Sequence, residues 1–495
     1  MKVAFVTPEL LSLVRRTNLA GVAESLAQAL LRNGADVRVF LPRTAQVNIE
    51  MLTDVKDPVE VTVKDGRTPR TFEVRKGKLA GLPVMLFENE QLFGTRHPYG
   101  DEEGPYADNW RRYALFARAV LESLPHVGFT PDVFHCVDWS TGMLPVYHEA
   151  DYLKKKPDHP AAKAGTFFSI HNLAMQGVFE REILPHIGLA HEHFRYVGGV
   201  ELAGKVNYLK AGAEYATVIG THSQSHAERI QQKDRGYGME ETFQRRKKEL
   251  VGISNGIDYA AWDPSSDPHL PSKFSTKDKD PAGKRRCKAA LQQSMGLDVG
   301  PRQPIACTIG RWDADSGFDL LAEILTPVLE RGVQLLIMGT GDADVHQRLR
   351  TMEGTFMGRC RVVHGYDAQA AHLIMAGSDL LLLPSHYNPS NSLFAVGMRY
   401  GVAPLVYASS GLEDLIVDTG ADEEKGTGFH FQPYSSEGLL EGIEGAVKFY
   451  RNASNWKALL RRLLAQDFSW ESTAAEYLKA YRRVTRRARA RHKAS

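Results

Sequence analysis

The sequence lacks three features that would place it in whole classes of proteins: a strong net charge, a long hydrophobic run and paired cysteines. Its 495 residues hold 61 lysines and arginines against 59 aspartates and glutamates, so a formal charge of +2 argues against nucleic acid as a partner. No apolar run approaches the roughly 18 residues of a membrane span. The four cysteines are scattered without disulfide-like or metal-like spacing, which fits reduced thiols and a cytoplasmic location.

Two catalytic signatures are also missing. A GxxxxGK[ST] loop and an HExxH helix are both absent, which argues against P-loop ATPases and zinc proteases. The start, MKVAFVTPE, is typical of a strand and not of a signal peptide. One local excess of charge is the arginine-rich end, residues 482–493, for which a solvated helix end is the plainer interpretation and an acidic partner the alternative.

Length and pattern predict two consecutive α/β domains. A chain of 495 residues exceeds one ordinary core. A strand over 2–7, a helix over 19–33 and a strand over 35–41 open the chain, which indicates a parallel sheet with right-handed crossovers. A second alternation of strands and helices begins at residue 304. The simplest architecture is two such domains facing across a cleft.

The domain boundaries follow from composition. Residues 263–281 are polar and contain prolines, so they are the best candidate for a linker. We predict an N-terminal domain over 1–262, a linker over 263–300, a C-terminal domain over 301–467, and a final helix with a basic tail over 468–495.

Polar residues follow the predicted strands in both halves: Asp138, His171, Arg311, Asp342 and Asn388. The carboxyl ends of parallel strands lie at one edge of a sheet, so residues far apart in the sequence converge there. Each residue taken alone has a structural interpretation; a single histidine is more often a hydrogen-bonded core residue than a catalytic group. Together they predict a protein that binds an anionic small molecule in the cleft.

The stretch 381–401, LLLPSHYNPSNSLFAVGMRYG, is the most informative of these strand ends. Its apolar run stops at Pro384, and Ser390, Asn391 and Ser392 lead into an apolar-periodic helix. This pattern predicts a buried strand that delivers a loop to a helix N-terminus, where open α/β sheets bind anions. An ordinary strand–loop–helix connection is the alternative.

Several segments, in order over residues 1–483, resemble bacterial glycogen synthases and plant starch synthases. These are retaining glucosyltransferases of the GT-B fold, built from two Rossmann-like doubly wound domains, and they use ADP-glucose. The segments that carry the resemblance include HPYGDEEGPYADN (97–109), PDVFHCVDW (131–139), SIHNLAMQGVF (169–179), GKVNYLKAGAEYA (204–216), LVGISNGIDYAAWDP (250–264), GVQLLIMGTGD (332–342) and FSWE (468–471).

In the N-terminal half, the resemblance implies residues around the donor and the transferred glucose. The family's KTGGL loop, whose glycines let backbone amides approach the diphosphate, corresponds to residues 15–19, RRTNL. Arg15 and Arg16 are therefore expected to contact the donor phosphates, although both glycines are replaced. Asp138 and His171 match the residues around glucose. Asn172 and Gln176 also fit the pattern and are expected to bind substrate.

In the C-terminal half, the family has an arginine and a lysine, five residues apart, that neutralise the leaving diphosphate. Arg311 matches the arginine, and Ser316 stands at the lysine position. Asn388 stands where the EPCGLTQ motif has a glutamate that contacts the glucose hydroxyls. Ser390, Asn391 and Ser392 take the places whose amides meet phosphate, and Phe394 is expected to fill space where the nucleotide or phosphate would lie.

Two functions remain as the main alternatives, with a GT-B transferase that uses another sugar nucleotide as a third, narrower one. The first is transfer of glucose from ADP-glucose to an α-1,4-glucan with retention, at weak activity, with Asp138, His171, Arg311 and Asn388 as catalytic residues. No metal or cofactor is implied, because fixed cations and helix amides meet the phosphate charge. The second is a catalytically silent paralogue that binds glucan or regulates an active synthase, since the substitutions fall on donor-contacting positions while the scaffold motifs are kept.

Overall fold

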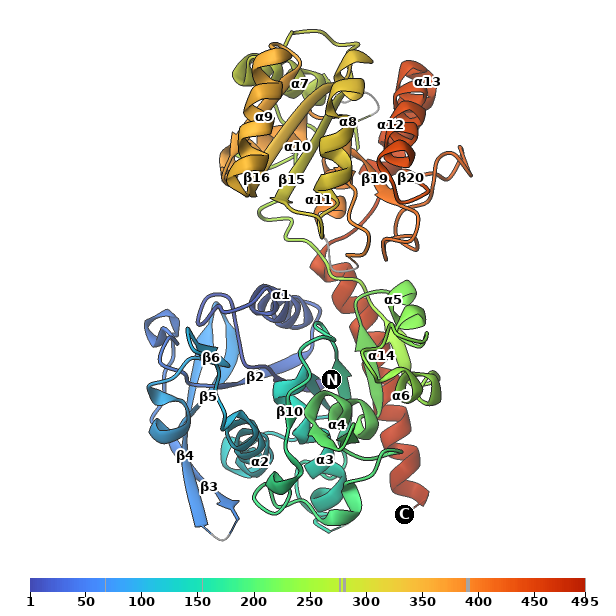
Figure 1. Ribbon diagram of the computed structural model, residues 1–495. Helices are drawn as coiled ribbons and strands as arrows, with labels where there is room; N and C mark the ends of the chain where they lie inside the picture. The colour runs from blue at the N-terminus through green and yellow to red at the C-terminus, as the bar shows by residue number, and fades with distance from the viewer. Residues whose placement is uncertain (67, 154, 276, 279–281, 389–391, 495) are drawn as a thin grey trace. The chain divides into compact units, whose positions relative to one another are not determined.

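The computed structural model describes residues 1–494 apart from 67, 154, 276, 279–281 and 389–391. The chain forms two compact units (Figure 1). Met1–Asn255 and Trp470–Ser495 make up the first unit, and Gly256–Ser469 make up the second. Among the described residues, no helix is long and apolar enough to cross a membrane.

The first unit is built on a nine-stranded sheet in the order β14-β13-β9-β8-β1-β2-β5-β4-β3. Its pairings are parallel except at β5-β4 and β4-β3, which are antiparallel. The strands are β1 Lys2–Val6, β2 Asp36–Pro42, β3 Val59–Asp65, β4 Thr68–Leu79, β5 Leu82–Glu88, β8 Val133–Val137, β9 Gly165–Ser169, β13 Val218–Thr221 and β14 Leu250–Gly252. The predicted parallel sheet is therefore present, and β4 and β3 form its antiparallel edge.

Helices cover both faces of this sheet. They are α1 Leu19–Arg32, α2 Asn109–Val127, α3 Met143–Tyr147, α4 Tyr208–Tyr215, α5 Gln224–Arg229, α6 Glu240–Arg245 and α14 Trp470–Ala494. Side chains of β1 alternate between two cores, because successive residues of a strand point to opposite faces. Val3 and Phe5 pack in the core with α1 and α14, and Ala4 and Val6 pack in the core with α2, α3 and α4.

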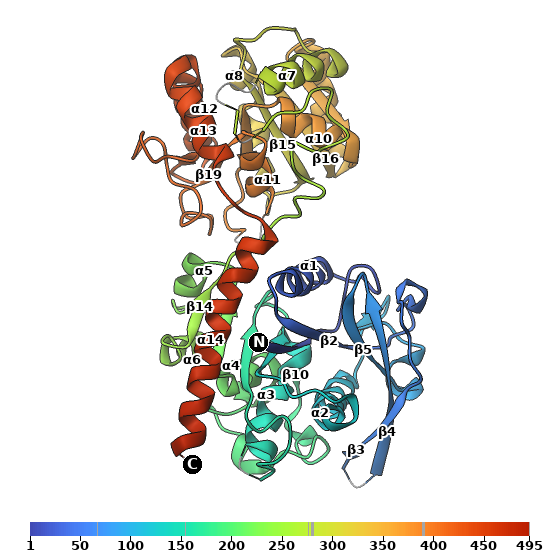
Figure 2. The same cartoon turned by 180° about the vertical axis from the view of Figure 1, so that it is seen from behind.

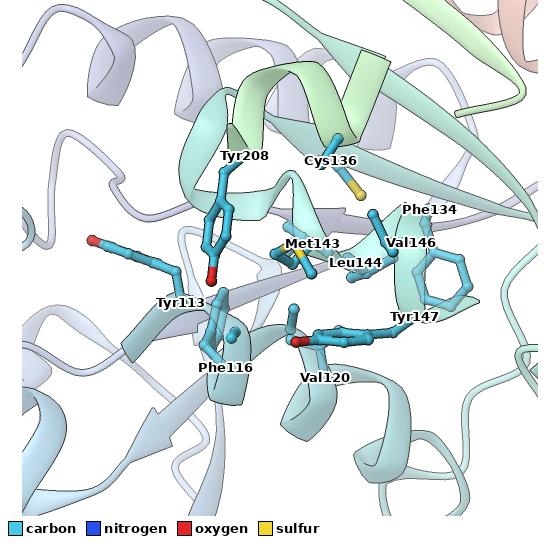
Figure 3. Packing of buried hydrophobic residues seen from close by; sticks show 14 of the residues in the cluster. Tyr113, Phe116, Val120, Phe134, Cys136, Met143, Leu144, Val146, Tyr147 and Tyr208 are labelled. Carbon is cyan, nitrogen blue, oxygen red and sulfur yellow. The ribbon is translucent and has the colours of Figure 1, made fainter. Parts of the chain in front are cut away.

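The second of these cores is rich in aromatic rings (Figure 3). Tyr113 and Phe116 come from α2, Tyr147 from α3 and Tyr208 from α4, and all four are fully buried. Two of the hydroxyls donate hydrogen bonds to backbone carbonyls, Tyr147 to Ile187 at 2.8 Å and Tyr208 to Trp110 at 2.7 Å. These bonds remove the cost of burying the polar ends of the rings.

Short elements decorate the loops of the first unit. A three-stranded antiparallel sheet has the order β10-β12-β11, and β6 pairs with β7. They are β6 Gly100–Asp101, β7 Gly104–Pro105, β10 Val178–Phe179, β11 Glu201–Leu202 and β12 Lys205–Asn207, with helical turns η1 Ile49–Met51, η2 Glu90–Gly94, η3 Trp139–Thr141, η4 His148–Tyr152, η5 Arg181–Ile183 and η6 His191–His193.

The second unit has a parallel sheet of six strands in the order β17-β16-β15-β18-β19-β20. The strands are β15 Ile305–Trp312, β16 Gln334–Gly341, β17 Cys360–His364, β18 Leu380–Leu383, β19 Ala403–Tyr407 and β20 Phe429–Phe431. The helices are α7 Ala282–Met295, α8 Phe318–Glu330, α9 Ala343–Thr355, α10 Ala368–Gly377, α11 Leu393–Arg399, α12 Ser436–Arg451 and α13 Ala453–Leu464. The run Leu380–Leu383 is buried throughout, as expected for an inner parallel strand.

The segment predicted as a linker, 263–300, belongs to the second unit instead. It contains α7, which packs against α10. At least one of its polar residues is hydrogen-bonded within this unit. The carboxylate of Asp267 accepts from the Tyr400 hydroxyl at 2.5 Å and pairs with His372 at 2.8 Å. Composition indicated a solvated linker because a buried aspartate and a solvated one look alike in the sequence.

The final helix belongs to the first unit, although it follows the second in the sequence. Figure 2 shows α14 running along the sheet of that unit, and it packs against α1 and β9. Two of its arginines bond to the unit: Arg487 forms an ion pair with Glu249 at 2.5 Å, and Arg483 donates to the carbonyl of Lys248. Part of the predicted basic tail is thus tied to the protein itself.

Candidate active site

Asp138 stands at the end of β8 with an uncommon backbone conformation. Its φ is 55° and its ψ is −177°, a region that only glycine adopts readily, at a cost of about 1–3 kcal/mol for other residues. The surrounding hydrogen bonds hold it there: its amide donates to Ser169 at 2.9 Å, and its carboxylate accepts from the amides of His171 at 2.7 Å and Asn172 at 3.3 Å. The ends of β8 and β9 are therefore joined, as the sequence predicted.

The carboxyl group of Asp138 is almost inaccessible to water. Burial raises its pKa to about 7, and the nearby carboxylate of Glu9 adds to this rise, against the two amide hydrogen bonds, which lower it. The whole residue is only 7% exposed. A buried carboxyl with a raised pKa at a strand end is a recurrent property of functional sites.

His171 is partly exposed, and a second histidine is hydrogen-bonded to its backbone carbonyl. The Nε2–H of His222 donates to the carbonyl of His171 at 2.7 Å, and the two rings lie 5.5 Å apart. Burial is the main cause that holds the pKa of His171 well below its usual value, and the charges of His222 and His135 act in the same direction. Its Nδ1 has no hydrogen-bond partner among the described residues. The neutral ring thus keeps one buried polar atom without a hydrogen bond, which is uncommon in a folded protein.

The loop 15–18 is tied down by Glu9, which follows β1. The carboxylate of Glu9 accepts from the amides of Arg16 at 2.6 Å and Thr17 at 2.8 Å, and from the Thr17 hydroxyl at 2.9 Å. It also accepts from the hydroxyl of Tyr99 at 2.7 Å. Glu9 is fully buried, whereas the side chains of Arg15 and Arg16 are exposed. The backbone amides that precede α1 therefore already donate hydrogen bonds to a carboxylate of the protein itself.

The replaced glycines do not strain this loop. Asn18 has φ −67° and ψ −16°, and Thr17 is not among the residues with positive φ. The hydroxyl of Thr17 accepts from the amide of Leu19 at 3.2 Å, in addition to its bond to Glu9. The RRTNL sequence is therefore compatible with an ordered loop, but one in which the threonine side chain takes up hydrogen bonds that a glycine would leave open.

The two other predicted residues of this unit differ in their surroundings. Asn172 is exposed, and its side chain accepts from the amide of Ala174 at 3.1 Å. Gln176 is bonded at both ends of its amide group: it donates to the carbonyl of Tyr237 at 3.0 Å and accepts from Asn207 at 2.6 Å. The structure therefore gives Gln176 a role in joining loops, and its predicted contact with substrate stays a prediction.

In the second unit, Arg311 and Ser316 lie on either side of one turn at the end of β15. The guanidinium of Arg311 pairs with Asp313 at 3.2 Å, and its side chain is 75% exposed. Asp313 also accepts from the amide of Ser316 at 2.9 Å. Hydrogen bonds from Ser316 and the charge of Arg311 lower the pKa of Asp313 despite its partial desolvation. One carboxylate thus organises the turn and orients the arginine.

This turn meets the loop that follows β18. The Ser385 hydroxyl donates to the carbonyl of Ser316 at 3.4 Å. Gly317 has φ 70°, and a Cβ there would lie 2.2 Å from the carbonyl oxygen of Pro384, so the close approach requires glycine. Farther along, the amide of Asn388 donates to Ser410 at 2.9 Å, after β19. The ends of three adjacent strands therefore converge at one edge, as predicted.

The 381–401 stretch has the predicted order of a buried strand, a loop and a helix. Ser390 and Asn391 lie outside the described residues. Ser392 is an exposed N-cap whose side chain makes no capping hydrogen bond, and α11 is only seven residues long. Phe394 was expected to fill nucleotide space, and this is wrong: it is 4% exposed and packs against Phe468 with ring centroids 5.3 Å apart. It is a core residue, because the first turn of α11 faces the interior.

Four residues of the site were not found from the sequence: Glu9, Tyr99, His222 and Asp313. Glu9 and His222 also follow strands, β1 and β13, so the strand-end rule that selected Asp138 and His171 applies to them too. Tyr99 and Asp313 lie in loops, and only the fold brings them to their partners.

The comparisons with known proteins agree with this architecture. Residues 2–245 match the starch synthase catalytic domain family. The chain is 34% identical over 484 residues to the glycogen synthase of Geotalea daltonii, covering 98% of this chain and 99% of that protein. It is 36% identical over 496 residues to the glycogen synthase of Moorella thermoacetica, covering 99% and 98%.

A solved structure agrees over the same length. The catalytic domain of starch synthase IV from Arabidopsis thaliana, bound to ADP and acarbose, superposes with a TM-score of 0.80 at 27% identity, covering 98% of this chain and 99% of that one. A sucrose-phosphate synthase from Thermosynechococcus elongatus, at 15% identity and a TM-score of 0.56, shares the fold. The predicted fold class, two Rossmann-like α/β domains of the GT-B type, is confirmed. The chain belongs to the glycogen and starch synthase family of glycosyltransferases.

Proposed function

We propose that the protein transfers glucose from ADP-glucose to the end of an α-1,4-glucan, with retention of the anomeric configuration. The observation that carries this proposal is the constellation around Asp138. A strained, buried carboxylate and a neutral histidine with a buried, unpaired Nδ1 occupy the positions that match the glucose-contacting residues of the family. Strain of this kind persists in folded proteins mainly where function requires it.

Each unit contributes one part of the chemistry in this proposal. His171 and Asp138 orient the glucose, and the negative charge of ionised Asp138 stabilises positive charge that develops on the sugar ring. Arg311, which pairs with Asp313, neutralises charge on the departing diphosphate. Asn388 offers an amide to the sugar hydroxyls in place of a carboxylate. Arg15 and Arg16 supply further positive charge from the exposed side of their loop.

The proposal includes a low turnover. The resemblance implies two cations that neutralise the leaving diphosphate. This chain has only Arg311 at these two positions, because Ser316 carries no charge. The ligands in the starch synthase IV structure, ADP and acarbose, support a nucleoside diphosphate and an α-glucan as the ligand classes for this chain as well.

The direct test is an assay of the purified chain with ADP-glucose and glycogen, in which ADP release and incorporation of labelled glucose are both measured. We expect slow incorporation that depends on both substrates, and NMR of the product should show new α-1,4 linkages. The Arg311→Ala variant serves as the background. Incorporation by the wild-type protein that does not exceed this background would exclude the transferase.

A second candidate, a glucan-binding protein without turnover, is favoured by one observation. The amides of Arg16 and Thr17 are already donated to the buried carboxylate of Glu9, so they are not available to a donor phosphate in this conformation. Hydrogen bonds to a charged acceptor are worth about 1.5–3 kcal/mol each, so a phosphate does not displace Glu9 easily. In this candidate the protein binds the glucan and acts on an active synthase.

Glu9→Gln tests whether the internal carboxylate competes with a donor. The substitution removes the negative charge and keeps the shape, so the amides of residues 16 and 17 are held less firmly. If Glu9 competes with phosphate, we expect the variant to bind ADP about tenfold more tightly in isothermal titration calorimetry, which corresponds to about 1.4 kcal/mol. Glu24→Gln is the matched control. Glu24 lies in α1, the helix that follows this loop, and its carboxylate accepts from the amide and the hydroxyl of Ser12. Equal ADP affinities in wild type and Glu9→Gln would show that Glu9 does not compete.

A further inference from the structure

The second unit contains a cavity of about 620 Å³ that the proposed function does not use. It lies between α7, the loop that holds Arg302, and the adjoining ends of α12 and α13. Asp379, which lines it, precedes β18 and accepts from the amide of Ile305 at 2.8 Å, at the start of β15. Arg311 lies at the other end of β15. At about 3.3 Å per residue, the cavity and Arg311 are roughly 20 Å apart.

The cavity has a strong excess of positive charge. Six lysines and arginines line it, against the single carboxylate of Asp379. The two innermost lysines are fully bonded within the protein. Lys284 donates to three backbone carbonyls at 2.8–3.2 Å, and Lys288 donates to Asp379 at 2.6 Å and to the hydroxyl of Tyr450 at 2.8 Å. These bonds hold the two lysines in the wall of the cavity, so an anionic ligand would contact the other cations that line it.

Three cations at the mouth are available for that ligand. Arg302 and Arg451 are exposed, and Lys457 is half-buried. Among the described residues none of the three has an ion-pair partner, although acidic side chains are as common in this chain as basic ones. Cations that gather around a cavity without counter-charges repel one another, and an anionic ligand relieves that repulsion.

The inner wall is apolar and aromatic. Trp456 and Tyr450 meet edge to face with ring centroids 4.9 Å apart, and Leu460 and Ala453 extend the same surface. Tyr450 is held by its bonds to Lys288 and to the carbonyl of Pro301 at 3.1 Å. A rigid apolar wall beneath a charged mouth fits a molecule with an anionic end and a flat, weakly polar body, and the volume lies in the usual range for small-molecule sites.

We propose that this cavity binds a phosphorylated small metabolite. The phosphate group contacts Arg302, Arg451 and Lys457, and the body, a nucleoside or a sugar ring, packs on Tyr450 and Trp456. A bound ligand joins α7 to α13 and thereby stabilises the second unit. The proposal does not rest on the transferase activity, because none of these residues belongs to the candidate active site.

Calorimetry on the full chain tests the site with AMP and glucose 6-phosphate as probes, which separate the nucleoside from the sugar. Adenosine, glucose and inorganic phosphate are the partial probes. We expect at least one phosphomonoester to bind with a Kd below about 1 mM, and at least about tenfold more tightly than its uncharged part or phosphate alone. If no probe binds in this range, or if phosphate alone binds as well as the phosphomonoesters, the proposal is wrong.

Variants locate the binding. The double variant Arg451→Ala with Lys457→Ala should weaken binding of the phosphomonoester at least about tenfold and leave the melting temperature of the free protein unchanged. Lys448→Ala, on the same helix α12 but outside the cavity, is the matched control and should bind normally. Binding should also survive Arg311→Ala. Loss of binding in Arg311→Ala, with full binding in the double variant, would place the ligand in the candidate active site and refute this proposal.

Discussion

Replacing Arg311 with alanine should lower kcat/KM for ADP-glucose about 10²–10³-fold, with most of the loss in kcat. Removal of one preorganised group that stabilises charge in the transition state costs roughly 3–4 kcal/mol. Arg311 is the cation that the resemblance places on the leaving diphosphate, and its side chain is exposed and oriented by Asp313. Because Ser316 brings no second charge, no neighbour at this turn compensates for the loss. Initial rates over a range of ADP-glucose concentrations measure the effect.

The reciprocal variant, Ser316→Lys, should raise the turnover. The backbone of residue 316 is already held by Asp313, and its carbonyl by Ser385, so a longer side chain is added to an ordered turn. A second cation at this place should recover part of the same factor of about 10²–10³. Ser294→Lys, which adds the same charge at an exposed position of α7, controls for the change in net charge. An unchanged kcat in Ser316→Lys, together with a normal rate in Arg311→Ala, would show that this turn does not meet the diphosphate.

The sheets were largely predictable because their strands are buried on both faces. The apolar run Leu380–Leu383 and the strand at the start of the chain are found at the expected places, since parallel strands read as continuous hydrophobic segments. The convergence of Asp138 with His171 followed from the same rule, because the ends of neighbouring parallel strands meet at one edge. These predictions used local patterns and one topological rule.

What failed depended on partners that are distant in the sequence. The motif position alone predicts that Phe394 fills ligand space, but its contact with Phe468 places it in the core. Likewise, composition predicts a linker over 263–300, although Asp267 bonds to residues more than a hundred positions away. The role of Glu9 required the loop and Tyr99 to be seen together. Sequence patterns identify a polar residue, and only tertiary structure shows whether it meets solvent, ligand or protein.

Substituting Asp138 with asparagine should make the protein more stable at pH 8 and much less active. The folded protein holds the pKa of Asp138 at about 7, against an ordinary value of 3.8. The folded state therefore binds this proton more tightly than the unfolded state, and wild-type stability falls as the pH rises from about 4 to about 7. A neutral asparagine carries no such cost. At about 1.36 kcal/mol per pKa unit, the gain at pH 8 is a few kcal/mol, up to about 4.

The pH dependence of this gain separates it from a general packing effect. Urea unfolding of wild type and Asp138→Asn should give a difference in unfolding free energy that is small near pH 5 and grows until about pH 7, where it becomes constant. Asp57→Asn, at an exposed position, should show no such trend.

Transfer by Asp138→Asn should fall about 10²-fold or more, because the negative charge beside the sugar is lost. Ionised Asp138 lowers the stability of the folded protein at the pH at which transfer needs its charge. We therefore attribute the presence of this carboxylate to function and not to stability. A variant that is no more stable than wild type at pH 8 would contradict this account of Asp138.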